Sequence, residues 1–197
     1  MGSDYYYQHC CCLLAIIVVL LLIIPVHGDS SDDLIQKTCK NTKYYDVCVS
    51  SLKSDSTSSN ASDTKGLAQI MVRVGVANAT ATKSYLSSLI AGGGGGGAND
   101  TASTATAAAM KKVLRDCADK YSYAGEALLA SIQDLDAEMY DYAYMHVMAA
   151  ADYPNACHNG FRRYPGLAYP RQLAIREQGF KRICDVVMEM LHSLLLS

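Results

Sequence analysis

Apolar side chains recur every three or four residues along four long stretches of this chain, the spacing of one face of an α-helix. The first stretch opens at Asp63, and the second opens near Thr101 or Ser103. The first carries the apolar positions Leu67, Ile70, Val74, Ala77, Ala81, Tyr85 and Leu89. The second carries a heptad-like seam at Met110, Leu114, Cys117, Tyr121, Ala124, Leu128, Ser131 and Leu135. Both patterns predict long helices that pack in a bundle.

A turn is expected at residues 133–136, followed by a third helix that Pro154 should break or kink before Cys157. Residues 159–170 hold two prolines and two glycines and predict a loop. A fourth helix is expected from about Arg171 to Leu195. The apolar positions of the third helix are Met139, Tyr142, His146, Ala149 and Tyr153, and those of the fourth are Phe180, Ile183, Val187, Met190 and Leu194. Since no stretch alternates as a strand does, the predicted fold is an all-α, up-down four-helix bundle.

Two short helical segments precede the bundle, within residues 29–52, and each carries one cysteine, Cys39 and Cys48. Isolated helices shorter than about 12–15 residues are marginal in water. A disulfide between the two cysteines would staple the segments into an α-hairpin. A Ser-rich loop, 53–62, follows. Later in the chain, the consecutive glycines within 91–98 predict a flexible linker between the first two bundle helices.

The N-terminus carries an apolar run from Cys10 to Ile24 that ends at Pro25. This run is shorter than the roughly 20 residues of a membrane-spanning helix and has the length of a signal-peptide core. Cleavage is expected after Gly28, so that residues 1–28 form a secretory signal peptide and 29–197 a single domain. The residues before the run include no Lys or Arg, which leaves an uncleaved anchor as the alternative.

An exported protein meets an oxidising compartment, so its cysteines are read as a disulfide framework. Cys39, Cys48, Cys117, Cys157 and Cys184 remain after cleavage, an odd set that predicts two disulfides and one free thiol. With the turn near residue 135, Cys117 and Cys157 fall at nearly the same height on antiparallel helices. That pair is feasible, whereas Cys117–Cys184 depends on a helix whose register the sequence does not fix. Cys184 is expected to be the odd, buried and inert thiol.

The charge balance, 17 Lys and Arg against 19 Asp and Glu, argues against nucleic acid, whose phosphates demand a basic surface. Three glycosylation sequons begin at Asn60, Asn78 and Asn99. In a secreted chain they are glycan acceptors where they are exposed. Asn60 and Asn99 lie in loop-like sequence, whereas Asn78 lies in a helical pattern and must face outward to be modified.

The sequence carries little that indicates catalytic chemistry. His146 is expected to be a hydrogen-bonded core residue rather than a metal ligand or base, and the adjacent Cys157 and His158 point apart on a helix. The acids Asp134, Asp136, Glu138 and Asp141 suit helix capping better than a calcium site or a catalytic pair. No cofactor or metal motif is present in the sequence. Not all of the fourteen tyrosines can lie in the core, and exposed tyrosines suit a protein interface.

Five sequence segments together resemble the plant invertase and pectin methylesterase inhibitor family. The segments are IQKTC at 35–39, YDVCVSSL at 45–52, LRDCADKY at 114–121, AAADYPNACHNGF at 149–161 and RICDVV at 182–187. The resemblance spans roughly residues 32–196. It implies a four-helix bundle with an N-terminal α-hairpin and the disulfides Cys39–Cys48 and Cys117–Cys157. It also implies that the protein is not an enzyme but a stoichiometric inhibitor of an enzyme of the cell wall or vacuole.

Members of that family are divided between two protein targets. In one branch, three bundle helices pack across the substrate cleft of pectin methylesterase. In the other, a Pro-Lys-Phe tripeptide near the start of the third bundle helix enters the active site of an acid invertase. The corresponding segment here is QDLDAE at 133–138, whose acids would repel catalytic carboxylates.

The sequence therefore favours pectin methylesterase slightly, with acid invertase as the alternative. It predicts a 1:1 complex and no cofactor. The expected location is the apoplast, with the vacuole also open. A non-inhibitory extracellular interaction module is the remaining alternative.

Overall fold

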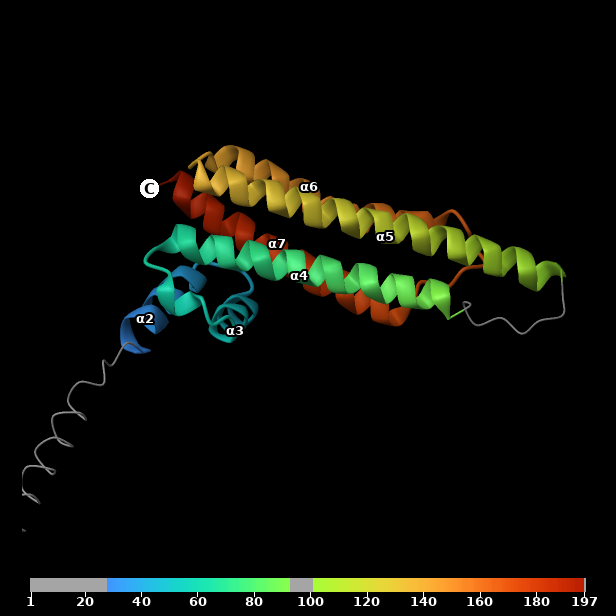
Figure 1. The fold of residues 1–197 in the computed structure, drawn as a ribbon, viewed down its shortest axis with the longest axis horizontal. Helices are drawn as coiled ribbons and strands as arrows, with labels where there is room; N and C mark the ends of the chain where they lie inside the picture. The colour runs from blue at the N-terminus through green and yellow to red at the C-terminus, as the bar shows by residue number, and fades with distance from the viewer. Residues whose placement is uncertain (1–27, 93–100, 197) are drawn as a thin grey trace, which may run out of the picture.

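The computed structural model describes residues 28–92 and 101–196. Within them lie an N-terminal hairpin and four long helices (Figure 1). The hairpin consists of α2 (Gly28–Cys39) and α3 (Tyr45–Ser54), and a short 3-10 helix, η1 (Ser58–Asn60), follows it. The long helices are α4 (Thr64–Ala91), α5 (Thr101–Asp136), α6 (Tyr140–Arg162) and α7 (Arg171–Leu195). The predicted all-α bundle with a stapled hairpin is confirmed, and α7 has the predicted bounds.

The four long helices pack in cyclic order, α4 on α5, α5 on α6, α6 on α7 and α7 on α4. Figure 1 shows α5 beside α6, α4 beside α7, and the hairpin at the end of the bundle where α4 begins. The predicted signal peptide lies outside the described residues except for Gly28, the first residue of α2. Of the predicted linker 91–98, Ala91 ends α4 and Gly92 follows it, while the remainder lies outside the described residues.

The start of α4 and the end of α5 have identifiable local causes. The Asp63 side chain accepts a hydrogen bond from the Gly66 backbone N–H at 2.8 Å, an N-cap that satisfies one of the free donors of α4. At the end of α5, Met139 N donates to Asp134 O at 2.8 Å and Glu138 N donates to Leu135 O at 3.2 Å. This pair of bonds is a Schellman motif.

The Schellman motif places the α5–α6 turn directly after the segment where it was predicted. Residues 133–136 still belong to α5, so the turn prediction is wrong, and the chain reverses at 137–139 instead. Glu138 adopts a positive φ of 58° there, in the left-handed region where glycine is usual. The sequence carried no glycine to mark the position.

The core confirms the α5 seam and corrects two others. From Leu114 to Leu135 every predicted seam position of α5 is buried. The second half of α4 is rotated from the predicted stripe, because Ala77 and Ala81 are exposed. Its buried positions there are Gly75, Ala79, Thr82 and Leu86.

α6 differs most from its prediction. It continues through Pro154 to Arg162, so the break expected before Cys157 is wrong and the loop spans only 163–170. Tyr142 lies on the outside rather than in the core. The buried residues of α6 are Ala143, Val147, Ala150, Pro154, Cys157 and Phe161. In the first half of α6 the core thus contains small side chains, while Tyr142, Met145 and Met148 are exposed.

Candidate functional site

An apolar surface follows the outward side of α6 in its first half. Tyr142, Met145 and Met148 are 59%, 57% and 48% exposed, and Ala149 beside them is also exposed. Residues three or four apart on a helix share a face, so these four side chains form one surface, which we call the α6 outer face. Monomeric proteins rarely expose contiguous large apolar side chains unless they bind something there. Tyrosine and methionine are also enriched at protein interfaces.

The predicted acidic cluster is present at the end of this face, but its members do not converge. Asp134 Oδ2 lies 2.6 Å from His146 Nδ1. Gln69 Nε2 donates to Asp136 Oδ1 at 2.6 Å, and Lys65 Nζ donates to Glu138 Oε1 at 3.0 Å. The hydrogen bond from Lys65 to Glu138 raises the pKa of that lysine. Asp136 and Glu138 therefore tie the α5–α6 turn to α4, whereas Asp134 pairs with α6. His146 is a half-exposed partner of Asp134 rather than a core residue.

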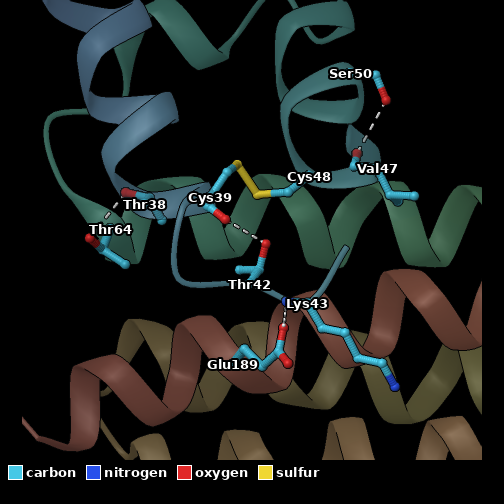
Figure 2. Close-up of a disulfide and its surroundings, with 9 residues drawn as sticks. All are labelled: Thr38, Cys39, Thr42, Lys43, Val47, Cys48, Ser50, Thr64 and Glu189. Carbon is cyan, nitrogen blue, oxygen red and sulfur yellow. Dashed lines mark hydrogen bonds between the residues drawn. A yellow bond between two sulfur atoms is a disulfide. The ribbon is translucent and has the colours of Figure 1, made fainter. Parts of the chain in front are cut away.

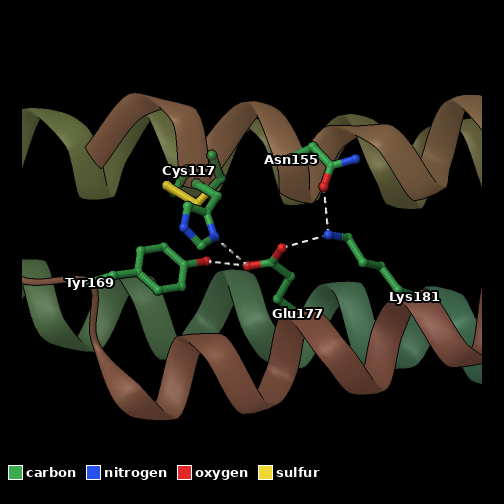
Figure 3. A network of polar contacts seen from close by, with 7 residues as sticks. Cys117, Asn155, Tyr169, Glu177 and Lys181 are labelled. Carbon is green, nitrogen blue, oxygen red and sulfur yellow. Dashed lines mark hydrogen bonds and ion pairs between the residues drawn. A yellow bond between two sulfur atoms is a disulfide. The ribbon is translucent and has the colours of Figure 1, made fainter. Parts of the chain in front are cut away.

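A buried carboxylate, Glu177, forms a second polar centre between α6, α7 and the loop that joins them (Figure 3). Tyr169 Oη donates to Glu177 Oε2 at 2.7 Å, and Lys181 Nζ donates to Oε1 at 2.6 Å. His158 Nδ1 lies 3.3 Å from Oε2. Figure 3 shows Tyr169 and Lys181 reaching the carboxylate from opposite sides. His158 also stacks on the Tyr169 ring, with centroids 4.3 Å apart.

These contacts set the ionisation of the centre. Burial raises the pKa of Glu177, but the hydrogen bonds from Lys181 and Tyr169 outweigh burial and hold that pKa below its usual value. Burial, followed by the hydrogen bond to Glu177, raises the pKa of Tyr169, so the phenol keeps its proton. The ionised carboxylate of Glu177 accepts hydrogen bonds from α6, from α7 and from the loop between them. It therefore holds these three segments together.

Glu177 was not singled out from the sequence, although one signal could have found it. It lies four residues after Leu173 and three before Phe180, at a buried position of the α7 seam. A charged residue at such a position is almost never fully buried unless it is paired. The sequence could therefore have indicated a buried ion pair with Lys181, four residues further along the same helix. It could not have indicated the two partners from other segments, Tyr169 and His158.

The first disulfide, Cys39–Cys48, joins the two helices of the hairpin (Figure 2). Next to it, Thr42 Oγ1 donates to Cys39 O at 2.7 Å within the turn between α2 and α3. The following backbone N–H, that of Lys43, donates to Glu189 Oε2 of α7 at 2.8 Å. The stapled turn is thus fixed to the last helix of the bundle.

In the bundle, Cys117 of α5 is joined to Cys157 of α6, with Cα atoms 4.6 Å apart. Cys184 is buried and is the one cysteine of the described residues outside a disulfide. Burial, followed by the nearby Asp185, raises the pKa of its thiol to about 12. Since the thiolate is the reactive form of cysteine, the environment of Cys184 disfavours nucleophilic chemistry.

The sequons differ in access. Asn60 is exposed in η1. Asn78 is half-buried in α4, and its Oδ1 is shielded from solvent without a hydrogen-bond partner among the described residues. Asn99 lies outside the described residues. The structure therefore presents Asn60 for modification far better than Asn78.

No group of three or more His, Cys, Asp or Glu in residues 28–92 and 101–196 is placed to hold a metal ion. Within the same ranges, no helix is long and apolar enough to cross a membrane.

Comparison with known proteins gives consistent results. The family model "Plant invertase/pectin methylesterase inhibitor" matches residues 33–190. The chain is 51% identical over 161 residues to "Cell wall / vacuolar inhibitor of fructosidase 2" of Arabidopsis thaliana, covering 82% of this chain and 83% of that protein. It is 41% identical over 158 residues to "Pectinesterase inhibitor 28" of Oryza sativa subsp. japonica, covering 80% and 67%.

Among solved structures, a mutant form of a pectin methylesterase inhibitor from Arabidopsis matches with a TM-score of 0.59 at 22% identity, covering 80% of this chain and 95% of that one. At that identity the match concerns the fold alone. It agrees with the bundle and hairpin described above.

Proposed function

The chain belongs to the plant invertase and pectin methylesterase inhibitor family, and on that premise we propose that it is a secreted protein inhibitor of a plant acid invertase. The observation that carries this choice of target is its 51% identity to a fructosidase inhibitor over 82% of the chain. This proposal reverses the slight preference for pectin methylesterase drawn from the sequence.

The preference for pectin methylesterase depended on the acids of residues 133–138. Asp134, Asp136 and Glu138 are each hydrogen-bonded to a side chain of this protein, namely His146, Gln69 and Lys65. Carboxylates engaged in this way present less uncompensated charge to an approaching enzyme than three free acids would. Repulsion is therefore a weaker reason to reject invertase than the sequence alone indicated.

Pectin methylesterase remains the second candidate, for two specific reasons. The segment 133–138 contains no Pro-Lys-Phe tripeptide, the element that the family resemblance associates with invertase binding. The pectinesterase inhibitor from rice is also a relative at 41% identity.

Inhibition by this protein requires a surface rather than a catalytic group. The α6 outer face offers one, because its tyrosine and methionines bury a large apolar area on contact and the flexible methionines adapt to the surface that they meet. Covering the substrate cleft of the target excludes substrate, and the target's own catalytic residues need not be altered. We place the α6 outer face at the centre of a 1:1 complex in the apoplast, or in the vacuole, with a glycan on Asn60.

The test is a parallel titration of mature protein, residues 29–197 with both disulfides formed, against an acid invertase and a pectin methylesterase at mildly acidic pH. Saturable loss of invertase activity alone, with an endpoint near one inhibitor per enzyme, is the expected result. Loss of methylesterase activity alone would mean that the protein inhibits pectin methylesterase, the second candidate, instead of acid invertase. If both enzymes keep full activity, the protein is not an inhibitor of either class.

A further inference from the structure

We propose that hydrogen peroxide oxidises Met145 and Met148 at the centre of the α6 outer face, and that this oxidation switches target binding off. The switch rests on the proposed function, because it acts through the α6 outer face. The modification itself follows from where the methionines lie.

The methionines of the described residues fall into distinct groups by access. Met71 and Met190 are 0% and 1% exposed, and Met110 and Met188 are half-buried. The three that are exposed lie within one ten-residue segment, 139–148. A thioether in contact with solvent is open to peroxide, whereas one packed in a core is protected.

Met145 and Met148 lie three residues apart in α6, and both belong to the outer face with Tyr142. Met139 is also exposed, but it lies at the turn, before the first residue of α6. Oxidation at the two helical positions would therefore modify the centre of the outer face, while oxidation of Met139 would modify its edge.

The chemistry needs only peroxide and sulfur. A lone pair of the thioether sulfur attacks one peroxide oxygen, the O–O bond breaks, and the sulfoxide forms with release of water. The sulfur loses two electrons and the peroxide gains them. Methionine sulfoxide reductases reverse the oxidation, and a separate enzyme acts on each of the two sulfoxide epimers.

The consequence for binding follows from the polarity of the product. A sulfoxide is a strong hydrogen-bond acceptor, so burying it against an enzyme surface without a donor is unfavourable. The fold should not respond, since both side chains lie outside the core and the buried methionines keep their protection. The modification thus acts on the interface and spares the bundle.

The experiment treats the mature protein with graded hydrogen peroxide, maps each methionine by peptide mass spectrometry, and titrates both enzymes with treated and untreated samples. Circular dichroism checks that the helices persist. The matched variants are Met145→Leu/Met148→Leu, which removes both sulfurs of the face, and Met110→Leu/Met188→Leu, which removes two half-buried ones. For each variant the readout is the ratio of its apparent inhibition constant after treatment to that before.

We expect Met145 and Met148 to oxidise well before Met71 and Met190. The ratio should rise by about tenfold or more in the wild type and in Met110→Leu/Met188→Leu, which is the effect of one unfavourable buried polar group. It should stay within about twofold in Met145→Leu/Met148→Leu, which has no sulfur to oxidise on the helical part of the face. A mixture of the two sulfoxide reductases should restore the wild type.

Equal oxidation of buried and exposed methionines would overturn the assignment of the sites. An unchanged ratio in the oxidised wild type, or an equal rise in Met145→Leu/Met148→Leu, would overturn the switch. Failure of the proposed function has a different signature, because the untreated protein would then inhibit neither enzyme. The peptide map would still decide whether the two sites are selectively oxidised.

Discussion

Gly75 of α4 lies directly against Leu128 of α5, so closely that a Cβ at position 75 would come 2.8 Å from the Leu128 Cδ1 atom. Leu128 is buried and has little room to move. Helices approach closely where one of them lacks a side chain, and Gly75 provides that space between α4 and α5.

Replacing Gly75 with alanine should destabilise the protein, although alanine favours the helix. Alanine gains roughly 1 kcal/mol of helix propensity, but overpacking a core costs about 1–3 kcal/mol. The net loss in the free energy of unfolding, measured by urea titration, should be about 1 kcal/mol.

Gly179→Ala is the matched control for Gly75→Ala, since nothing lies within 4 Å of its added Cβ in α7. It should raise the free energy of unfolding by about 0.5–1 kcal/mol. If both alanine variants changed the free energy of unfolding in the same direction, the close contact between α4 and α5 would be contradicted.

The left-handed Glu138 yields a second prediction. Glu138→Gly should raise the free energy of unfolding by about 0.5–1 kcal/mol, because glycine adopts the Schellman conformation without strain. The lost contact with Lys65 is exposed and contributes little. Glu138→Gln removes the charge but keeps the strain, so its stability in the same urea titration should stay near that of the wild type. If both variants had a higher free energy of unfolding than the wild type, the loss of charge rather than the relief of backbone strain would be the cause.

Glu177 should give the protein an acid-sensitive component of stability. Its folded pKa lies below the usual value, so the carboxylate contributes stability above the unfolded pKa of about 4.3. That contribution disappears as the pH falls through the folded pKa.

Glu177→Gln should therefore lower the free energy of unfolding by about 2 kcal/mol at pH 6 and flatten its decline below pH ~4.5. Urea titrations at several pH values measure both effects. Glu126→Gln, which changes an exposed acid of α5, serves as the control. A parallel shift of the whole pH profile in Glu177→Gln would exclude the ionised carboxylate as the source.

The α5–α6 disulfide should support both the fold and the proposed inhibition. Removing a cross-link that closes a loop of 40 residues costs about 4 kcal/mol in the chain-entropy model. Cys117→Ser/Cys157→Ser should accordingly melt well below the wild type in calorimetry and inhibit more weakly at 37 °C. Cys184→Ala removes a buried thiol that closes no loop, so it should cost less. Wild-type stability after reduction and alkylation would contradict the prediction.

Substitution on the α6 outer face should weaken inhibition without changing the stability of the fold. Tyr142→Ala should raise the apparent inhibition constant by about tenfold or more, as truncating a central aromatic side chain of an interface does. Its melting temperature should remain that of the wild type, because Tyr142 is largely exposed. Tyr45→Ala, at an exposed tyrosine of α3, should inhibit normally. Equal effects of the two variants would place the interface elsewhere.

The α5 seam was predictable because its apolar positions follow one heptad-like pattern that runs on to Leu135. α6 was not, because it carries apolar residues on two faces, and the pattern gave more weight to the larger side chains. The Cα atoms of Cys117 and Cys157 lie 4.6 Å apart where α5 and α6 are joined, and the buried residues in the first half of α6 are Ala143, Val147 and Ala150. The tyrosine and methionines were consequently placed outside.

The candidate site was accessible to sequence reasoning only in part. Tyrosine content predicted an interface, and Tyr142 belongs to one candidate surface, but a single sequence does not distinguish an exposed apolar stripe from a core stripe. The centre at Glu177 depends on Tyr169, Lys181 and His158, which meet only once the loop 163–170 has folded back on α7. The pairing of Lys181 with Glu177 follows a local i,i+4 pattern, but no local pattern encodes the contacts of Tyr169 and His158.

The bond from Lys43 to Glu189 implies an order of assembly during biosynthesis. Chains emerge with the N-terminus first, so the hairpin is complete while the helix that receives it is still unmade. The Cys39–Cys48 link needs only local closure, with nine positions separating its cysteines, and can form at that time. The hairpin can therefore be covalently closed before Glu189 of the last helix is synthesised, and its bond to Glu189 forms only afterwards. The hairpin also packs on α4, so a chain truncated near its C-terminus would keep that contact but lose the bond to Glu189 that fixes the stapled turn.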